Sequence, residues 1–398
     1  MTLRRLLALA VALFALGARA GTPGWDGIAA QARGQTVHFN AWAGDEKTNA
    51  FIAWVGAEVA RRYGVTIDHV KLKDTAEAVT RVVAEKSAGR DRGGTVDLIW
   101  INGPNFLALK EQKLLFGPFT AKLPNFALVD TTNVRSNVVD FTVPVDGLES
   151  PWRRAQIVFV YDGKRVADPP RSVPQLLAWA KRHSGRTTHP AVRNFLGATF
   201  LKQAIYELTP DAAVLQQPAT DANFAAVTAP LWAWYDALRP LLWRHGEQFP
   251  ENGPAQRQLL NDGEIDLMVS FNPAEAAVAE SAGQLPESVR TVVFGRGTIG
   301  NTSFVAIPYN AANKEGAMVV ANFLLEPSVQ ARAQDFRQMG NFTVLDLGKL
   351  APAERKAFDA LPRHPALPTD AELRATLPEP HPSWMTRIAA EWERRYTK

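Results

Sequence analysis

The sequence contains no cysteine, and this absence removes several kinds of chemistry at once. Without a thiol, the chain can form no disulfide bond, no thiolate metal site and no cysteine nucleophile. It also lacks the residue that carries a lipid anchor at a processed N-terminus. Lipid-mediated attachment through cysteine is therefore excluded.

Long hydrophobic runs are absent beyond the first twenty residues. Near the start, two adjacent arginines precede an apolar run at residues 6–16, and an A-x-A pattern ends at Ala20. This order is typical of a secretory signal peptide, and the run is shorter than the roughly 18 residues that a membrane span needs. We expect residues 1–20 to be removed, so that a soluble mature chain begins at Gly21. The arginine pair leaves the export route open between the general and the twin-arginine pathways.

Neither sign of charge dominates the chain. The 44 basic residues exceed the 40 acidic ones by four, and three of the arginines lie in the expected leader, which leaves a mature net charge of +1. Proteins that bind nucleic acids concentrate positive charge on one face. We therefore expect no nucleic-acid partner.

Catalytic and metal-binding motifs are missing as well. The sequence has no G-x-S-x-G, H-E-x-x-H, P-loop or EF-hand pattern, and its seven histidines show no metal-ligand spacing. One formal match, G-x-G-x-x-G at residues 295–300, leads into a strand-like run, whereas a dinucleotide site must open a helix. We interpret this segment as a ligand-facing turn or hinge connection. We expect no catalytic residue, no cofactor and no metal.

The acidic residues have structural explanations. Asp45 and Glu46 precede an expected helix, where negative charge favours the helix dipole. Asn272 is a good N-cap for a helix that opens at Pro273, and Glu275 can complete a capping box there.

What the sequence does contain is an alternation of strand-like and helix-like segments. Strand-like runs lie at residues 36–39, 65–70, 96–101, 155–161, 265–270, 289–294 and 303–307. Helical patterns lie at residues 51–63, 75–88, 173–182, 197–208, 230–243, 314–325, 328–336 and 384–396. Continuous apolar strands that alternate with helices indicate an α/β protein with parallel sheets covered by helices.

The length of the mature chain, 378 residues, exceeds what one hydrophobic core of roughly 250 to 300 residues usually supports. We therefore predict two lobes. Residues 21–154 would form the first part of lobe 1 and residues 155–294 would form lobe 2. Residues 295–398 would return to lobe 1 and supply C-terminal helices.

Five ordered blocks of sequence resemble a known family. They are FNAWAGDEKTNAFIAWV at 39–55, VDLIWINGPNF at 96–106, VDGLESPWRRAQIVFVYD at 145–162, DGEIDLMVSFNPAEA at 262–276 and GTIGNTSFVAIPYNAANKEGAMVVANFLLEPSVQ at 297–330. These blocks resemble extracellular solute-binding proteins of ABC importers, in particular the YnjB-like subgroup, which is related to thiamine-, polyamine- and ferric-ion-binding receptors. The resemblance implies a two-lobed periplasmic-binding-protein fold of type II, with each lobe a doubly wound sheet and the ligand cleft between the lobes.

The resemblance also implies a function. The chain would be a monomeric, unanchored periplasmic receptor that hands a small molecule to an ABC permease and its ATPase. Two alternatives remain: a secreted hydrolase or lyase on the same scaffold, and a binding module used for sensing rather than import.

Ligands of open α/β sheets bind beyond the carboxyl ends of the strands. The loops expected at that position, together with the crossover, supply the predicted ligand-binding residues. These are Trp42, Gly44, Trp100, Asn102, Gly103, Trp152, Gln156, Ser270, Asn272, Thr298, Gly300, Asn301 and Thr302.

The tryptophans have different expected roles. Trp42, beside Gly44 in a polar loop, is expected to stack on the ligand, whereas Trp54 belongs to the buried face of a helix. Trp100 could serve either the ligand or the core, because it stands at the end of a buried strand. Indole faces, together with Asp45, Glu46 or Glu149, suit an organic cation, and a thiamine-like cation is favoured over a polyamine-like one. The ferric-ion-binding receptors that the chain resembles use adjacent tyrosines, and because no two of the six tyrosines here are adjacent, iron is not favoured.

Overall fold

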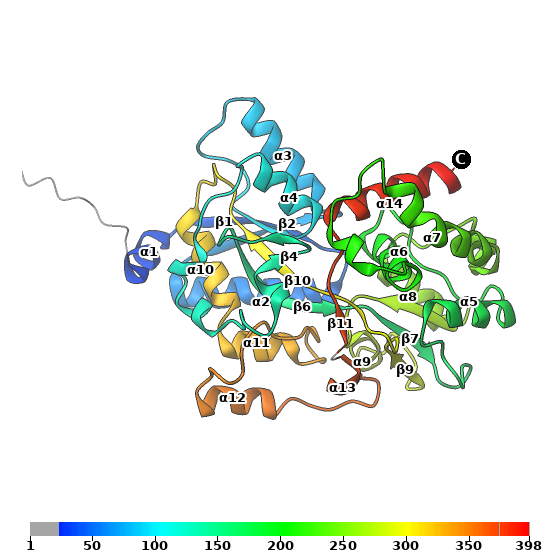
Figure 1. Ribbon diagram of the computed structural model, residues 1–398. Coiled ribbons are helices and arrows are strands. Elements are labelled where there is room, and N and C mark those ends of the chain that lie inside the picture. The colour runs from blue at the N-terminus through cyan, green and yellow to red at the C-terminus, as the bar shows by residue number, and fades with distance from the viewer. Residues whose placement is uncertain (1–23, 374, 398) are drawn as a thin grey trace, which may run out of the picture.

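A computed structural model of the chain describes residues 24–373 and 375–397, so the expected signal peptide lies outside the described residues. The described chain forms two lobes, each built on its own sheet (Figure 1). Within the described residues, no helix is long and apolar enough to cross a membrane.

The sheet of lobe 1 contains a parallel unit in which β1 lies between β2 and β3. The strand β10 pairs antiparallel with β3 on one side and with β6 on the other, and β11 pairs parallel with β10. These strands are β1 (Thr36–Trp42), β2 (Thr66–Leu72), β3 (Leu98–Ile101), β6 (Glu149–Gln156), β10 (Thr298–Ala306) and β11 (Thr376–Leu377). The parallel strands predicted from the first apolar runs are therefore present.

Helices cover both faces of this sheet. One core contains Leu98 and Trp100 and is closed by α1, α2, α10, α11 and α12, whereas the other contains Ile99 and Ile101 and is closed by α3 and α4. Because successive side chains of a strand point to opposite faces, a strand buried on both sides is apolar throughout. The helices of lobe 1 are α1 (Trp25–Ala32), α2 (Glu46–Tyr63), α3 (Ala76–Ser87), α4 (Pro104–Glu111), α10 (Lys314–Leu324), α11 (Pro327–Gln334) and α12 (Pro352–Asp359).

The sheet of lobe 2 has β7 at its centre, antiparallel to both of its neighbours. Its strands are β7 (Val158–Asp162), β8 (Leu267–Ser270) and β9 (Val289–Val292). Its helices are α5 (Val173–Arg182), α6 (Phe195–Leu208), α7 (Phe224–Leu238), α8 (Gly253–Asn261) and α9 (Glu275–Ser281). Phe159 and Val160 of β7 belong to separate cores, so this sheet is also covered on both faces.

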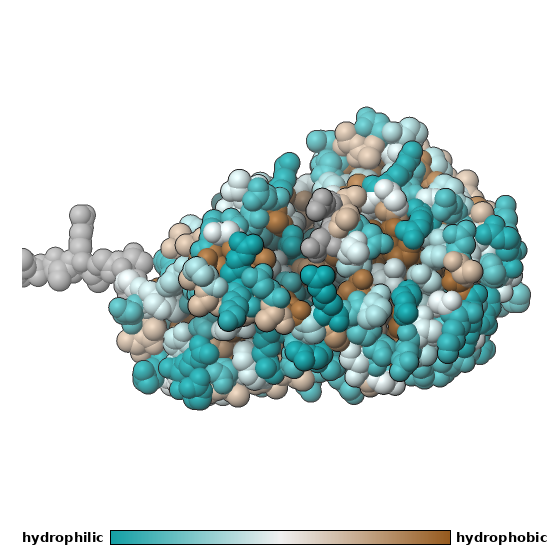
Figure 2. Space-filling view, turned by 90° about the horizontal axis from the view of Figure 1, so that it is seen from below, coloured by the Kyte–Doolittle hydropathy of each residue, from teal (hydrophilic) through white to brown (hydrophobic). Residues whose placement is uncertain are grey.

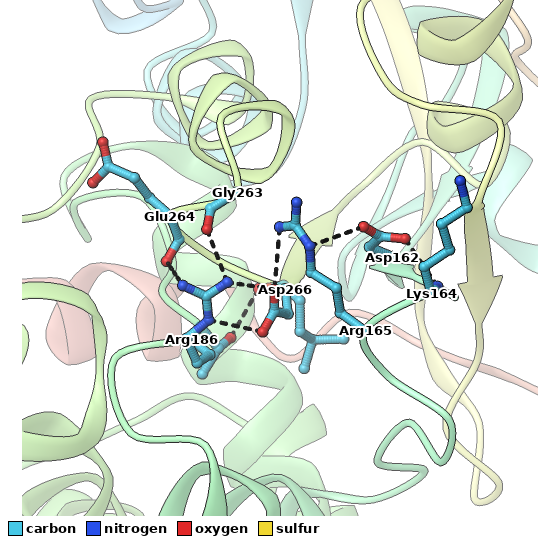
Figure 3. A network of polar contacts seen from close by, with 9 residues as sticks. Asp162, Lys164, Arg165, Arg186, Gly263, Glu264 and Asp266 are labelled. Carbon is cyan, nitrogen blue, oxygen red and sulfur yellow. Dashed lines mark hydrogen bonds and ion pairs between the residues drawn. The ribbon is translucent and has the colours of Figure 1, made fainter.

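A network of arginines and carboxylates fixes the start of β8 (Figure 3). Arg186 donates from Nε and Nη2 to the two carboxylate oxygens of Asp266, at 2.8 and 2.6 Å. Arg165 approaches Asp266 at 3.4 Å and Asp162 at 3.2 Å. The network stabilises the end of β8 that lies opposite Ser270.

The C-terminal segment runs from lobe 1 back to lobe 2. After α12, the chain forms α13 (Asp370–Leu373) and β11, and then α14 (Pro382–Tyr396). The helix α14 lies against lobe 2 (Figure 1), and its Trp384, Ile388 and Trp392 are buried in the core of that lobe. The short strands β4 (Val139–Asp140) and β5 (Val143–Pro144) form a hairpin beside the crossover.

Several element predictions differ from the structure. The expected strand at 155–161 is two strands, β6 and β7, which separate at Ile157 as the chain changes sheets. The helix expected from Pro230 begins at Phe224, and Pro230 lies inside it. The expected turn at 295–302 is largely the start of β10. Gly300 lies within that strand. A side chain is excluded at this position because a Cβ would lie 2.6 Å from Thr376 Cγ2, so the glycine allows close packing rather than a turn.

The helix predicted to open at Pro273 begins instead at Glu275. The Asn272 side chain accepts a hydrogen bond from the Ala274 N–H at 3.0 Å, which makes a local turn rather than a helix cap. The predicted capping box was wrong because Glu275 points to Arg257, with Oε1 accepting from Nη1 at 2.8 Å.

Candidate functional site

A cleft of about 410 Å³ lies between the two lobes. Lobe 1 contributes the residues that follow β1, β2 and β3, and lobe 2 contributes the residues that follow β8 and precede α6. Among the lining residues are Trp42, Asp45, Lys73, Trp100, Asn102, Arg153, Arg193, Asn194, Arg257, Ser270, Asn272, Glu275, Ser303, Asn341, Met385 and Thr386. The cleft therefore lies where the carboxyl ends of the strands meet, as expected for open α/β sheets.

Five of the residues singled out in the sequence line this cleft. They are Trp42, Trp100, Asn102, Ser270 and Asn272. They come from both lobes, so a bound molecule would contact both sheets at once.

Two predicted glycines shape the edge of the cleft. A Cβ at Gly44 would overlap the indole ring of Trp42, so this glycine allows the ring to lie flat against the loop. Gly103 has a φ of 58°, precedes α4 and packs against the ring of Phe141. Its N–H donates to Asp140 Oδ2 at 2.5 Å.

The remaining predicted residues lie behind the cleft, in the strands that connect the lobes. Trp152 is 1% exposed and packs with its ring 5.2 Å from that of Trp100. Gln156 donates to Thr298 Oγ1 at 3.0 Å, and Thr302 donates to Asn137 Oδ1 at 2.9 Å. These residues, together with Gly300 and Asn301, are outside the cleft lining and hold β6 and β10 in place.

The indole of Trp42 is half-buried and forms an aromatic surface of lobe 1 in the cleft. It meets Trp100 edge to face, with ring centroids 6.3 Å apart and an interplanar angle of 83°. Trp100 is only 8% exposed, and the guanidinium of Arg153 lies 4.1 Å from its ring centroid. A ligand cation would stack on the face of the Trp100 ring, and the guanidinium of Arg153 already covers this face.

Arg153 is held in the cleft by neutral groups. Its Nη1 donates to Asn341 Oδ1 at 2.9 Å and its Nε donates to Ser303 Oγ at 3.4 Å. Burial lowers the pKa of Arg153 to about 9, so the side chain remains a cation at neutral pH. Arg153 was not among the ligand-binding residues predicted from the sequence.

The carboxylates of the cleft are engaged by the protein itself. Asp45 caps α2 by accepting from the Thr48 N–H at 2.8 Å. Glu275 is paired with Arg257, and burial raises the pKa of Glu275 despite that pair. Asp45 thus lies at the start of α2, as expected from the sequence, and it also caps that helix.

Several helices begin at the cleft. The lining includes the first residues of α2, α4, α6 and α8, and their N-terminal N–H groups carry partial positive charge. Asn194 caps α6 by accepting from the Leu196 N–H at 3.0 Å, and Asn252 caps α8 by accepting from the Ala255 N–H at 2.9 Å. The backbone thus adds a positive potential to the cleft.

The C-terminal helix was not anticipated as part of the site. Met385, Thr386 and Ala389 of α14 line the cleft from the side of lobe 2. The helix was predicted from its periodicity, but its docking partner could not be read from that pattern. Among the described residues, no group of three or more histidine, cysteine, aspartate or glutamate side chains is arranged to hold a metal ion.

Comparison with known proteins identifies the family to which this fold belongs. A model of the bacterial extracellular solute-binding proteins matches residues 54–346. The chain belongs to this family. It is 42% identical over 387 residues to protein YnjB of Escherichia coli (strain K12), and the match covers 97% of each chain. The resemblance found in the five sequence blocks is therefore confirmed.

Solved structures of binding proteins share the fold. The periplasmic binding protein AfuA of Actinobacillus pleuropneumoniae superimposes with a TM-score of 0.64 at 13% identity, over 91% of this chain and 98% of that one. The spermidine/putrescine ABC transporter substrate-binding protein PotD of Streptococcus pneumoniae gives a TM-score of 0.62 at 13% identity, with the same shares covered. The predicted two-lobed periplasmic-binding-protein fold is confirmed.

Proposed function

We propose that the chain is the receptor of an ABC importer, which captures a small organic solute and delivers it to a membrane permease driven by an ATPase. The observation that carries this proposal is the cleft of about 410 Å³, lined by both lobes. A volume of this size suits a small molecule, and a ligand held from both sides couples binding to closure of the lobes. Family membership supports the same role.

The composition of the cleft favours binding over catalysis. Its described lining contains no histidine, cysteine or tyrosine. Ser270 Oγ lies 3.5 Å from Glu275 Oε2, and Glu275 is committed to Arg257. A hydrolase or lyase would need an activated nucleophile or an acid–base pair aimed at the substrate.

The ligand would stack its apolar part on Trp42, as expected from the sequence. The thiamine-like or polyamine-like cation remains the hypothesis that the sequence favours. Among the structural relatives, PotD belongs to a spermidine/putrescine transporter, whereas AfuA was solved with fructose-6-phosphate bound. Relatives with ligands of opposite charge share this fold, so the charge of the ligand has to be inferred from this chain's own residues.

The proposed location is the periplasm, after cleavage of the signal peptide behind Ala20. The face seen in Figure 2 is mostly hydrophilic, with apolar residues in small separate groups, which supports a monomer. Intact-mass measurement of the exported protein should give a chain that begins at Gly21.

The receptor function is tested by ligand-induced closure. Small-angle scattering should show a smaller radius of gyration when the bound ligand is present, because only the closed form contacts it from both lobes. The same ligand should raise the melting temperature, since a hundredfold excess over Kd stabilises the native state by about 2.7 kcal/mol. Steady conversion of the ligand into a product would refute the receptor function. Tight binding without compaction would refute only the hinge.

A further inference from the structure

Two arginines line the cleft without a carboxylate partner. Arg153 comes from β6, and Arg193 comes from the exposed loop that precedes α6 in lobe 2. Among the described residues, neither forms an ion pair, whereas Arg257 of the same cleft is paired with Glu275 at 2.8 Å. Each lobe thus presents to the cleft a guanidinium that no described carboxylate holds in an ion pair, although the charge of Asp45 acts on Arg153 from a greater distance.

Arg153 is positioned rather than flexible. Its guanidinium rests on Trp100, 4.1 Å from the ring centroid, and it donates to Asn341 and Ser303. These contacts use Nε and Nη1 and leave the other terminal nitrogen, Nη2, without a hydrogen-bond partner among the described residues. A guanidinium fixed in this way is suited to accept a planar or tetrahedral anion.

The acidic residues of the cleft lining, Asp45, Asp74 and Glu275, are fewer than its basic residues, Lys73, Arg153, Arg193 and Arg257. Asp45 accepts from the Thr48 N–H, and Asp74 accepts from the Ala76 N–H at 2.8 Å, so both serve helix starts. Glu275 is held by Arg257. The basic side chains of the lining therefore outnumber its carboxylates by one, and, among the described residues, Arg153 keeps a donor, Nη2, free for an anion.

We propose that the cleft binds an organic anion, whose carboxylate or phosphate group is held by Arg153 and faced by Arg193 while its apolar part lies against Trp42. This inference rests on the proposed receptor function and adds the charge class of the ligand. The N-terminal ends of α2, α4, α6 and α8, which lie in the cleft lining, reinforce it through the partial positive charge of each helix start. The proposal retains the stacking on Trp42 that the sequence predicted, but the proposed ligand is an anion, whereas the sequence favoured a cation.

The first test identifies the charge of the ligand. The protein is purified from its own periplasm, its bound molecule is detected by native mass spectrometry, and the molecule is then released in denaturant and passed over ion exchangers at pH 7. We expect retention on the anion exchanger, followed by assignment of carboxylate or phosphate from the fragment masses. Retention on the cation exchanger, or on neither, would overturn the inference and leave the receptor function intact.

Defined probes complete the test. Thermal melts are recorded with benzoate and phenyl phosphate, which carry the two anionic groups on a ring, and with thiamine and spermidine. We expect the anions to raise the melting temperature and the cations to leave it unchanged. A shift by a cation alone would refute the anion inference. If no probe shifts the melt and no molecule is carried from the periplasm, the inference and the receptor function both fall.

Variants assign the role to Arg153. Arg153→Gln should raise the Kd for the better-binding anion by about 10- to 100-fold, the loss expected for a hydrogen-bonded charge pair. Arg154→Gln is the matched control, because Arg154 is the next residue of β6, lies outside the cleft lining and donates to the Thr343 carbonyl at 2.9 Å. Arg193→Gln, on an exposed residue, should raise the Kd without changing the melting temperature of the free protein. Equal losses in Arg153→Gln and Arg154→Gln would contradict the assignment.

Discussion

Lys202 and Glu379 form an ion pair that is buried completely. Lys202 Nζ lies 2.6 Å from Glu379 Oε2, and the two side chains are 0% and 1% exposed. Lys202 belongs to α6 of lobe 2, and Glu379 lies in the segment between β11 and α14. Glu379 also accepts from Asn301 Nδ2 of β10 at 2.9 Å. The pair therefore joins lobe 2, a crossover strand and the C-terminal segment.

We predict that Glu379→Gln lowers the free energy of unfolding by about 3 kcal/mol. Removing one partner of a buried pair leaves an uncompensated charge, at a typical cost of about 3 to 5 kcal/mol. Because Asp140 can partly replace the charge of Glu379, we expect the loss of stability to lie at the lower end of this range. Burial, together with the charge of Glu379, raises the pKa of Asp140 well above its usual range. Without Glu379, Asp140 can ionise and partly balance Lys202.

Urea denaturation followed by tryptophan fluorescence measures these changes. Adding Asp140→Asn to Glu379→Gln should deepen the loss to about 5 kcal/mol, because no carboxylate then remains to compensate Lys202. Replacing both partners, as Lys202→Met with Glu379→Leu, should recover most of the stability. A loss below about 1 kcal/mol in Glu379→Gln would refute the reasoning. A double variant with Asp140→Asn that is no worse than the single one would refute the role of Asp140.

Two further predictions follow from the cleft and from the arginine network. Trp42→Ala should weaken ligand binding by about 1 to 3 kcal/mol, because the ring lines the cleft. Trp54→Ala should instead lower stability by roughly 3 kcal/mol, because the ring packs between Phe51 and Phe323. Calorimetry and thermal melts separate the two, and the reverse pattern would exchange their roles. Asp266→Asn should lose about 2 kcal/mol at pH 7, the value of hydrogen bonds to a charged group. Burial acts to raise the pKa of Asp266, but the ion pair with Arg186 outweighs burial and lowers that pKa in the folded state. The stability that the ion pair contributes is therefore present above the pKa of Asp266 in the unfolded chain, and it is lost as the pH falls through the pKa of Asp266 in the folded protein. Urea titrations should therefore show the variant and the parent converging as the pH falls below the unfolded pKa of an aspartate, about 3.9, and through the lower folded pKa, and a difference that persists at still lower pH would contradict the ion-pair explanation.

Local chemistry made much of the fold predictable. The bounds of α5, Val173–Arg182, match the sequence-based expectation, and the helix begins where the Ser172 hydroxyl accepts from the Gln175 N–H at 3.2 Å. The strand β3 was found because a strand buried on both faces is apolar throughout, whereas β1 and β2 were found from their short β-favouring runs. These signals lie within a few residues of the element that they specify.

Signals that depend on distant residues were misinterpreted. Gly300 suggested a turn, but the glycine is required because Thr376 packs against β10 from a segment far along the chain. Glu275 suggested a capping box, and it turns to Arg257 of another helix instead. In each case the local interpretation was chemically reasonable, and a tertiary contact determined the outcome.

The residues of the cleft also divide into those that local sequence signals predict and those that depend on tertiary packing. Trp42, Trp100, Asn102, Ser270 and Asn272 were placed correctly beside the strand ends, because topology alone brings those loops together. Arg193, Arg257 and Met385 could not be found in this way. They enter the cleft because α6, α8 and α14 pack around the sheet of lobe 2, and a helix periodicity does not name the neighbour that its faces will meet.

Trp100 shows how one such contact changes a functional conclusion. A tryptophan at the edge of a cleft can stack on a cation of the ligand or on a cation of the protein, and the sequence alone does not distinguish these. The register of β6 on β10 directs Arg153 and Ser303 to the same place, and Arg153 then covers the ring of Trp100. The aromatic surface that favoured a cationic ligand is thereby used within the protein. What it holds toward the cleft is a positive charge, and the ligand that complements it is an anion.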